Sequence, residues 1–149
     1  MANTPDARPA HLFPPVSLSK LNAMSANTLV SHLGIEFTEL GPNYIVARMP
    51  VDARTHQPLG MLHGGASVAL AETLGSVAAT LCVNPETQYC VGLEINANHI
   101  KSMRQGFVFG KAMPIHVGKR TQVWEIRITN EQDELVCVSR ITLAVIDRR

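Results

Sequence analysis

The hydrophobic and polar positions divide the chain into one long helical segment and several segments of strand character. Residues 63–83, HGGASVALAETLGSVAATLCV, are rich in Ala and Leu and exceed the length of an ordinary strand, which predicts a helix. Apolar residues surround most of it, as is typical of a helix buried on several sides. Four later segments are rich in β-branched residues and predict strands: 89–100, 107–117, 122–130 and 135–147.

Shorter elements precede the long helix. Two short helical turns are predicted, one capped by Ser17 and one ending at Gly34. Residues 35–40 and 44–51 predict a hairpin across a Gly-Pro-Asn turn. Short connections between the four later strands predict that consecutive strands pair antiparallel. One sheet face must be covered, and only one helix is long enough, so we expect an α+β fold with a curved antiparallel sheet wrapped around that helix.

The length of 149 residues fits one domain, which we place at residues 17–149. Residues 1–16 are proline-rich and predict a mobile tail or a packing arm outside the core.

Composition and charge narrow the function. A net charge of +1 excludes a surface that binds nucleic acid throughout, and 5% aromatic residues offer few platforms for stacked bases. No run of 18 apolar residues is present, so we expect no membrane contact, and residues 1–15 lack the apolar centre of a signal peptide. Three cysteines without a CxxC pair favour a reducing compartment, and we predict a cytoplasmic protein.

One charge interrupts the apolar helix. Glu72 is the only formally charged residue between Arg54 and Glu86. An unpaired buried carboxylate is costly, and this predicts a functional group; the alternatives are an exposed seam or a cation from elsewhere in the chain. Ser76 lies one turn further on the same face. It could hold a water with Glu72 or donate a hydrogen bond back to the Glu72 carbonyl.

The start of the helix carries a second candidate group. His63-Gly64-Gly65 follows Gln57, and glycine amides at a helix N-terminus can approach and stabilise an oxyanion. The alternative is an ordinary glycine-rich turn near which His63 and Gln57 are merely satisfied polar residues. Gly65 and Glu72 are separated by about 10 Å of helix, whereas one reacting carbonyl must lie about 3 Å from both groups. We therefore predict a two-fold dimer in which Gly65 of one helix faces Glu72 of the other.

A basic stretch follows the helix. No acidic residue lies between Glu94 and Glu125, and this interval contains Lys101, Arg104, Lys111, Lys119, Arg120, His99 and His116. Such cations suit a phosphorylated ligand, although a solvated strand-end surface is the alternative for each residue. A P-loop, a GxGxxG fingerprint, zinc-ligand spacing and a GxSxG elbow are all absent from the sequence. Any hydrolysis would therefore use a carboxylate.

Two stretches carry a specific resemblance. VDARTHQPLGMLHGGASVALAETLGS at 51–76 and VGLEINANHIKSMRQG at 91–106 resemble the hotdog-fold acyl-CoA thioesterases of the phenylacetate/4-hydroxybenzoyl type, and the likeness extends over residues 17–146. The resemblance implies a hotdog fold and hydrolysis of an aryl or hydroxyaryl acyl-CoA to the free acid and CoA. CoA would be part of the substrate, with no separate cofactor and no metal. Family members build their sites across a dimer and commonly pair dimers into tetramers.

The resemblance also implies roles for individual residues. Glu72 would be the nucleophile or general base, and the Gly65 amide would be the oxyanion donor. Gln57 and His63 would line the reacting end, and Ser76 would help to place water. The implied CoA-binding residues are Gly92, His99, Ile100, Lys101, Ser102, Arg104, His116, Val117, Gly118, Lys119, Arg120 and Thr121.

One position bears on the substrate. Val77 matches relatives of the 1,4-dihydroxy-2-naphthoyl-CoA type, which serve menaquinone biosynthesis, whereas relatives that act on carrier proteins tend to have Met. Two alternatives remain: a hotdog hydratase or dehydratase acting on 3-hydroxyacyl thioesters, and a non-catalytic acyl-CoA binding module. The HGG placement and Ser76 favour the thioesterase over the first, and Glu72 argues against the second.

Overall fold

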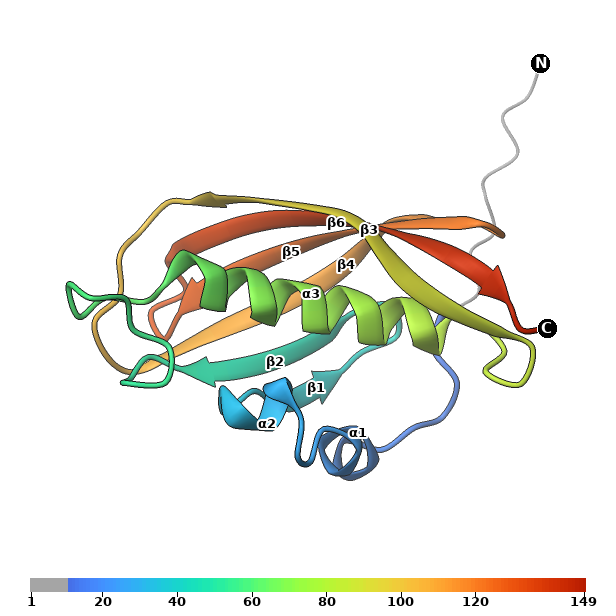
Figure 1. Cartoon of the computed structure of the whole chain (residues 1–149), viewed down its shortest axis with the longest axis horizontal. Coiled ribbons are helices and arrows are strands. Elements are labelled where there is room, and N and C mark those ends of the chain that lie inside the picture. Colours follow the sequence, from blue (N-terminus) through green and yellow to red (C-terminus); the bar gives the residue numbers. More distant parts are fainter. Residues whose placement is uncertain (1–10) are drawn as a thin grey trace, which may run out of the picture.

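The computed structural model describes residues 11–149 (Figure 1). Its elements are α1 (Leu18–Met24), α2 (Leu29–His32), β1 (Glu36–Leu40), β2 (Ile45–Pro50), α3 (Gly64–Leu81), β3 (Gln88–His99), β4 (Phe107–Val117), β5 (Thr121–Asn130) and β6 (Leu135–Asp147). Each predicted helix and strand is present within a few residues of its expected ends. Ser17 caps α1 as predicted, and Gly34 follows α2 with φ of 70°.

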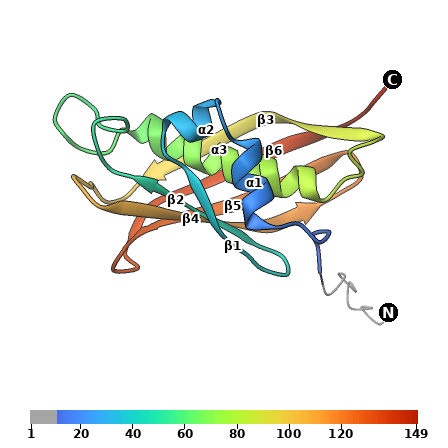
Figure 2. The ribbon, with the colours of Figure 1, turned by 90° about the horizontal axis from the view of Figure 1, so that it is seen from below.

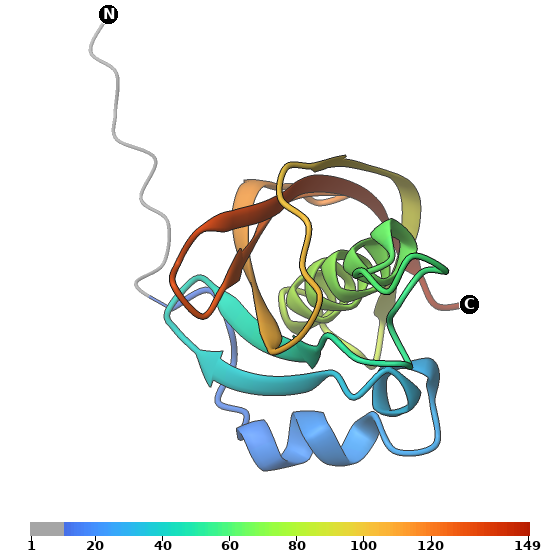
Figure 3. The same cartoon turned by 90° about the vertical axis from the view of Figure 1, so that its left-hand side faces the viewer.

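The strands form one antiparallel sheet in the order β1-β2-β4-β5-β6-β3, and this sheet curves around α3 (Figure 3). The predicted α+β fold is therefore confirmed. The side of α3 that faces the sheet is fully buried at Leu70, Leu74 and Ala78. Gly75 lets the helix approach the sheet closely, since a Cβ there would lie 2.4 Å from Cγ2 of Ile141.

The predicted pairing of consecutive strands is wrong for β3. This strand pairs with β6, from Gln88 opposite Asp147 to His99 opposite Cys137, while β4 pairs with β2. Residues 100–106 connect β3 to β4 and can extend over more than 20 Å, whereas three strand spacings amount to about 14 Å. The connection crosses the N-terminal end of α3 (Figure 3). β3 therefore becomes an edge strand of the sheet.

The short helices lie on the side of the molecule seen from below in Figure 2. The side-chain amide of Asn22 in α1 donates to the carbonyl of Phe37 at 3.0 Å and its oxygen accepts from the Phe37 N–H at 2.8 Å, which attaches α1 to β1. No helix of the described residues is long and apolar enough to cross a membrane.

The proline-rich segment contributes to the core. Residues 1–10 of the predicted tail lie outside the described residues. Phe13 is only 9% exposed, and its ring stacks on Trp124 with centroids 6.1 Å apart. The N–H of Leu12 donates to the carbonyl of Pro42 at 2.7 Å. The prediction that the segment lies outside the core is therefore wrong for Phe13, because its ring covers the apolar face of Trp124.

Candidate active site

The first turn of α3 contains two glycine N–H groups, of which one is hydrogen-bonded within the chain and the other is not. His63 is the N-cap, and its Nδ1 accepts the N–H of Gly65 at 2.8 Å. The predicted oxyanion donor is therefore already hydrogen-bonded to the His63 ring. The N–H of Gly64 donates to no group within residues 11–149. One free donor thus stands at the helix start, where the helix dipole favours negative charge.

Gln57 shares a cavity with Gly64. The cavity has a volume of about 360 Å³ and is lined by Gln57, Met61, Leu62, Gly64, Ser67, His99, Ile100, Lys101, Ser102 and Val136. Oε1 of Gln57 accepts the N–H of Leu59, which leaves the side-chain NH₂ as a donor with no acceptor in the described part of the chain. Two donors, on Gln57 and Gly64, therefore line one cavity.

The segment that follows β3 forms the opposite wall of this cavity. The ring of His99 lies against the helix start, since a Cβ on Gly64 would be 2.7 Å from its Nε2. Lys101 pairs with Glu134 at 2.7 Å. Arg104 lies beside the cavity rather than in its lining, and its guanidinium donates to the Leu59 carbonyl at 3.1 Å. The predicted group His99–Ser102 is thus brought to the helix start.

Glu72 does not lie where the apolar pattern suggested. Its side chain is exposed in the single chain, so the prediction of a buried carboxylate is wrong and the exposed-seam alternative describes it. The carboxylate lies beside β3, since a Cβ on Gly92 would be 3.0 Å from Glu72 Oε1. The physical reason is the position of β3 at the sheet edge, with no further strand beyond it. The Ser76 hydroxyl makes no hydrogen bond within residues 11–149, so it is not bonded back to the Glu72 carbonyl.

The other predicted CoA-binding segment lies far from the first. It is the hairpin between β4 and β5, which contains His116, Val117, Gly118, Lys119, Arg120 and Thr121. β4 begins beside the connection at the N-terminal end of α3 and runs toward the other end of the molecule (Figure 1). Its 11 residues cover roughly 35 Å. A single chain therefore does not bring the two segments together.

The cysteines offer no activated nucleophile. Cys137 is buried, and Cys82 and Cys90 are half-buried. Burial raises the pKa of all three thiols, that of Cys82 to about 12. A thiol with a raised pKa carries little nucleophilic thiolate near neutral pH. A carboxylate remains the better candidate.

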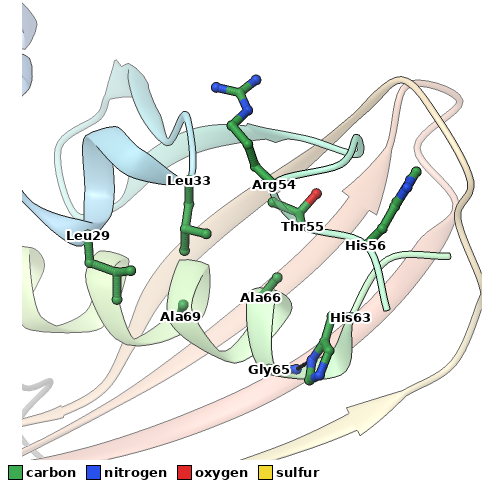
Figure 4. Close-up of a pocket in the computed structure, with 9 residues that line it drawn as sticks. All are labelled: Leu29, Leu33, Arg54, Thr55, His56, His63, Gly65, Ala66 and Ala69. Carbon is green, nitrogen blue, oxygen red and sulfur yellow. Dashed lines mark hydrogen bonds between the residues drawn. The ribbon is translucent and has the colours of Figure 1, made fainter. Parts of the chain in front are cut away.

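Sequence reasoning missed the residues of α2. A second cavity of about 290 Å³ lies between α2 and α3 (Figure 4), and its lining consists of Leu29, Leu33, Arg54, Thr55, His56, His63, Gly65, Ala66 and Ala69. Two leucines four residues apart, at the first residue and the C-cap of a short helix, are an ordinary packing pattern. Only their position over α3 shows that they border the helix start.

The model of the Thioesterase superfamily matches residues 59–137 of this chain. The chain belongs to the thioesterase superfamily. The match includes the start of α3, Glu72 and strands β3 through β5. The family assignment therefore rests on the elements that form the candidate site.

Individual relatives of this thioesterase agree with the assignment. The chain is 52% identical over 131 residues to a 1,4-dihydroxy-2-naphthoyl-CoA hydrolase of Escherichia coli, covering 88% of this chain and 96% of that protein. It is 53% identical over 130 residues to a proofreading thioesterase of Cronobacter turicensis, covering 87% and 94%. The crystal structure of a thioesterase from Haemophilus influenzae superimposes with a TM-score of 0.89 at 51% identity, covering 91% and 95%. Thioester hydrolysis is thus the activity of this chain, in preference to hydration or simple binding.

Proposed function

We propose that this thioesterase hydrolyses aryl acyl-CoA esters, such as 1,4-dihydroxy-2-naphthoyl-CoA, to the free acid and CoA at two equivalent sites between the subunits of a dimer. The observation that carries the proposal is the division of the site within one chain. Two free donors stand at the start of α3, on Gln57 and Gly64, whereas the Glu72 carboxylate lies about 10 Å further along the helix. In a dimer with two antiparallel α3 helices, the donors on Gln57 and Gly64 of one subunit would face the Glu72 carboxylate of the other.

In this mechanism the thioester carbonyl oxygen accepts hydrogen bonds from Gln57 and from a glycine amide at the helix start. The amide of Gly64 is free for this role, and that of Gly65 becomes free when His63 rotates. Glu72 of the partner subunit attacks the carbonyl carbon or deprotonates a water that attacks it, and Ser76 beside it positions that water. The C–S bond breaks, the CoA thiolate takes a proton, and water supplies the oxygen of the new carboxylic acid. No metal or cofactor is required.

The same arrangement explains the two separated CoA-binding segments. His99–Ser102 lies at the start of α3, and the β4–β5 hairpin lies near its other end. In an antiparallel pair of helices the hairpin of one subunit would approach the helix start of its partner. Lys119 and Arg120 of the hairpin would then face the phosphates of CoA.

The dimer surface is proposed on the edge strand. β3 leaves one row of backbone groups unpaired, and it exposes Tyr89 to 39%, Val91 to 40% and Leu93 to 64%. An exposed apolar edge strand of 12 residues suits pairing with its own copy about a two-fold axis. The outer sheet face also exposes Ile115 and Val117, which would serve the pairing of dimers into a tetramer.

The acyl group is proposed from two observations. The relative from Escherichia coli acts on a naphthoyl ester, and Val77 follows Ser76 as expected for that type. A cytoplasmic location and a place in menaquinone biosynthesis remain predictions from the sequence.

The test combines two variants in a thiol-trapping assay with naphthoyl-CoA. Glu72→Gln should lower kcat about 10²- to 10⁴-fold with little change in substrate binding. Glu86→Gln, an exposed glutamate in the turn after α3, is the matched control and should retain the wild-type rate. A Glu72→Gln protein that keeps most of its rate would remove Glu72 from the mechanism.

Mixing subunits tests the division of the site. Glu72→Gln and Gln57→Ala subunits, unfolded and refolded together in equal amounts, should recover about a quarter of the wild-type sites, because each mixed dimer holds one intact site. Mixed dimers that form, as shown by mass tags, yet remain inactive would refute a site shared between subunits.

A further inference from the structure

The cavity between α2 and α3 receives no part of the substrate in the mechanism above, which uses only His63 and Gly65 of its lining. We propose that it binds the acyl group of the thioester and selects uncharged, apolar acyl groups of about the size of two fused rings. This inference rests on the proposed function, because it takes the helix start as the place where the thioester reacts.

The position of the cavity relates it to the reacting carbonyl. His63 and Gly65 line it, while the adjoining Gly64 lines the cavity that contains Gln57 and His99. The first turn of α3 therefore separates two cavities. A thioester carbonyl held over that turn would direct the pantetheine arm into the cavity beside His99. The acyl group would then extend to the other side, toward α2.

The walls of the cavity are apolar and incompletely covered. Leu29 of α2 and Leu33, the C-cap of that helix, point toward Ala66 and Ala69 of α3 (Figure 4). Leu29 remains 63% exposed although its side chain is directed at another helix. The alanines leave the space beneath it open, because their side chains end at Cβ. An apolar ligand in this space would remove the leucine side chain from water.

The polar groups of the lining are already hydrogen-bonded within the chain. The Arg54 guanidinium donates to Asp52 at 2.6 and 3.1 Å, and the Thr55 hydroxyl donates to the Pro50 carbonyl at 2.7 Å. The ring of His56 shares a hydrogen bond of 2.9 Å with the Arg104 carbonyl, and His63 accepts from Gly65.

A charged acyl group such as succinyl would therefore meet no unpaired cation among the lining residues. It would have to lose its hydration without compensation, which is costly. This disfavours dicarboxylic acyl groups and favours uncharged ones.

The volume of the cavity limits the size of the acyl group that it can bind. An apolar cavity of about 150 Å³ binds benzene. The cavity under α2 measures about 290 Å³ and has room for roughly two rings or a straight chain of comparable volume. Smaller acyl groups would leave part of the apolar wall uncovered and would gain less from binding.

The experiment measures kcat/KM of the full-length enzyme for acetyl-, benzoyl-, 2-naphthoyl- and succinyl-CoA, with Leu29→Trp as the test variant. The indole should fill the cavity and lower kcat/KM for the naphthoyl ester about tenfold or more relative to the acetyl ester. Leu29→Ala should widen the cavity and lower selectivity for benzoyl over acetyl by a few-fold. Met24→Trp on α1 is the matched control, since Met24 is 70% exposed and does not line the cavity, and it should leave the selectivity unchanged.

The outcomes separate this inference from the proposed function. Thiol release with the same acyl selectivity in wild type and Leu29→Trp would refute the acyl cavity alone, as would a preference for succinyl-CoA. Light scattering could instead show that the Leu29→Trp protein no longer forms a dimer, with kcat/KM lowered by the same factor for every ester. This result would mean that a second subunit, and not the acyl group, occupies the cavity, and it would also refute the inference. Release of thiol from none of the esters by folded wild-type protein would refute the proposed function together with the cavity assignment.

Discussion

The two sides of α3 differ in what covers them. On the side that faces the sheet, Leu70, Leu74 and Ala78 are completely buried against the antiparallel sheet. On the opposite side Gly65 and Glu72 are exposed. One chain is sufficient to complete the core, whereas the groups suited to catalysis lie on the side that one chain leaves uncovered.

The buried side also satisfies its polar groups internally. The side chain of Gln122 is 1% exposed, donates to the carbonyl of Ala79 at 3.3 Å and accepts the indole N–H of Trp124 at 3.0 Å. On the open side the Gly64 amide, the Gln57 NH₂ group and the Ser76 hydroxyl have no partner within residues 11–149. Unsatisfied donors at an exposed surface are available to a ligand.

Truncation of one residue on each side gives the sharpest contrast in stability. Leu74→Ala should lower the free energy of unfolding by about 2–5 kcal/mol, because it leaves a cavity in a region of zero exposure. Thr73→Ala, the neighbour on the half-exposed side, should change it by about 0.5 kcal/mol or less. Urea denaturation of both variants measures the difference. Equal losses would show that the open side is packed as tightly as the core.

Two glycines allow the same substitution to be made on each side. A Cβ at Gly75 would lie 2.4 Å from Ile141 Cγ2, so Gly75→Ala should cost about 1–3 kcal/mol of stability through overpacking. A Cβ at Gly92 would lie 3.0 Å from Glu72 Oε1. Gly92→Ala should displace that carboxylate and lower kcat about tenfold with little loss of stability. Thermal unfolding and the thioesterase assay measure both effects for both variants. A loss of activity in Gly75→Ala without loss of stability, together with a loss of stability in Gly92→Ala without loss of activity, would contradict the contrast between the two sides of α3.

The smallest effect is expected in the loop that borders the open side. Hydrogen bonds from the side chain and N–H of Arg54 lower the pKa of Asp52 to about 2. The ionised form is therefore favoured in the folded state, and its contribution is present above about pH 4 and disappears as the pH falls toward 2. Both side chains are more than 40% exposed, so the contribution should be at most about 1 kcal/mol. Asp52→Asn should thus lower Tm slightly at pH 6 and not at pH 2; an equal difference at both pH values would exclude the ion pair as its cause.

Local patterns predicted the elements because each element is determined by residues close in sequence. The Ala- and Leu-rich run begins as a helix at Gly64 after the His63 cap, and the β-branched segments form β3 to β6. The pairing of β3 was mispredicted, because a seven-residue connection permits either an adjacent strand or a crossover. The crossover is favoured by hydrogen bonds between residues that are far apart in sequence. One example is the bond from the N–H of Leu62 to the carbonyl of Met103 at 2.8 Å.

The sequence by itself determined that a single acidic residue interrupts an apolar helix which begins with a glycine pair, and the family follows from these residues. Only the tertiary structure decided that Glu72 is exposed. Periodicity reports that a helix is apolar all round, but not whether a sheet from the same chain covers every side. Likewise, the hydrogen bond from Gly65 to His63 and the cavity beneath Leu29 depend on side-chain positions, and these follow from packing between segments distant in sequence.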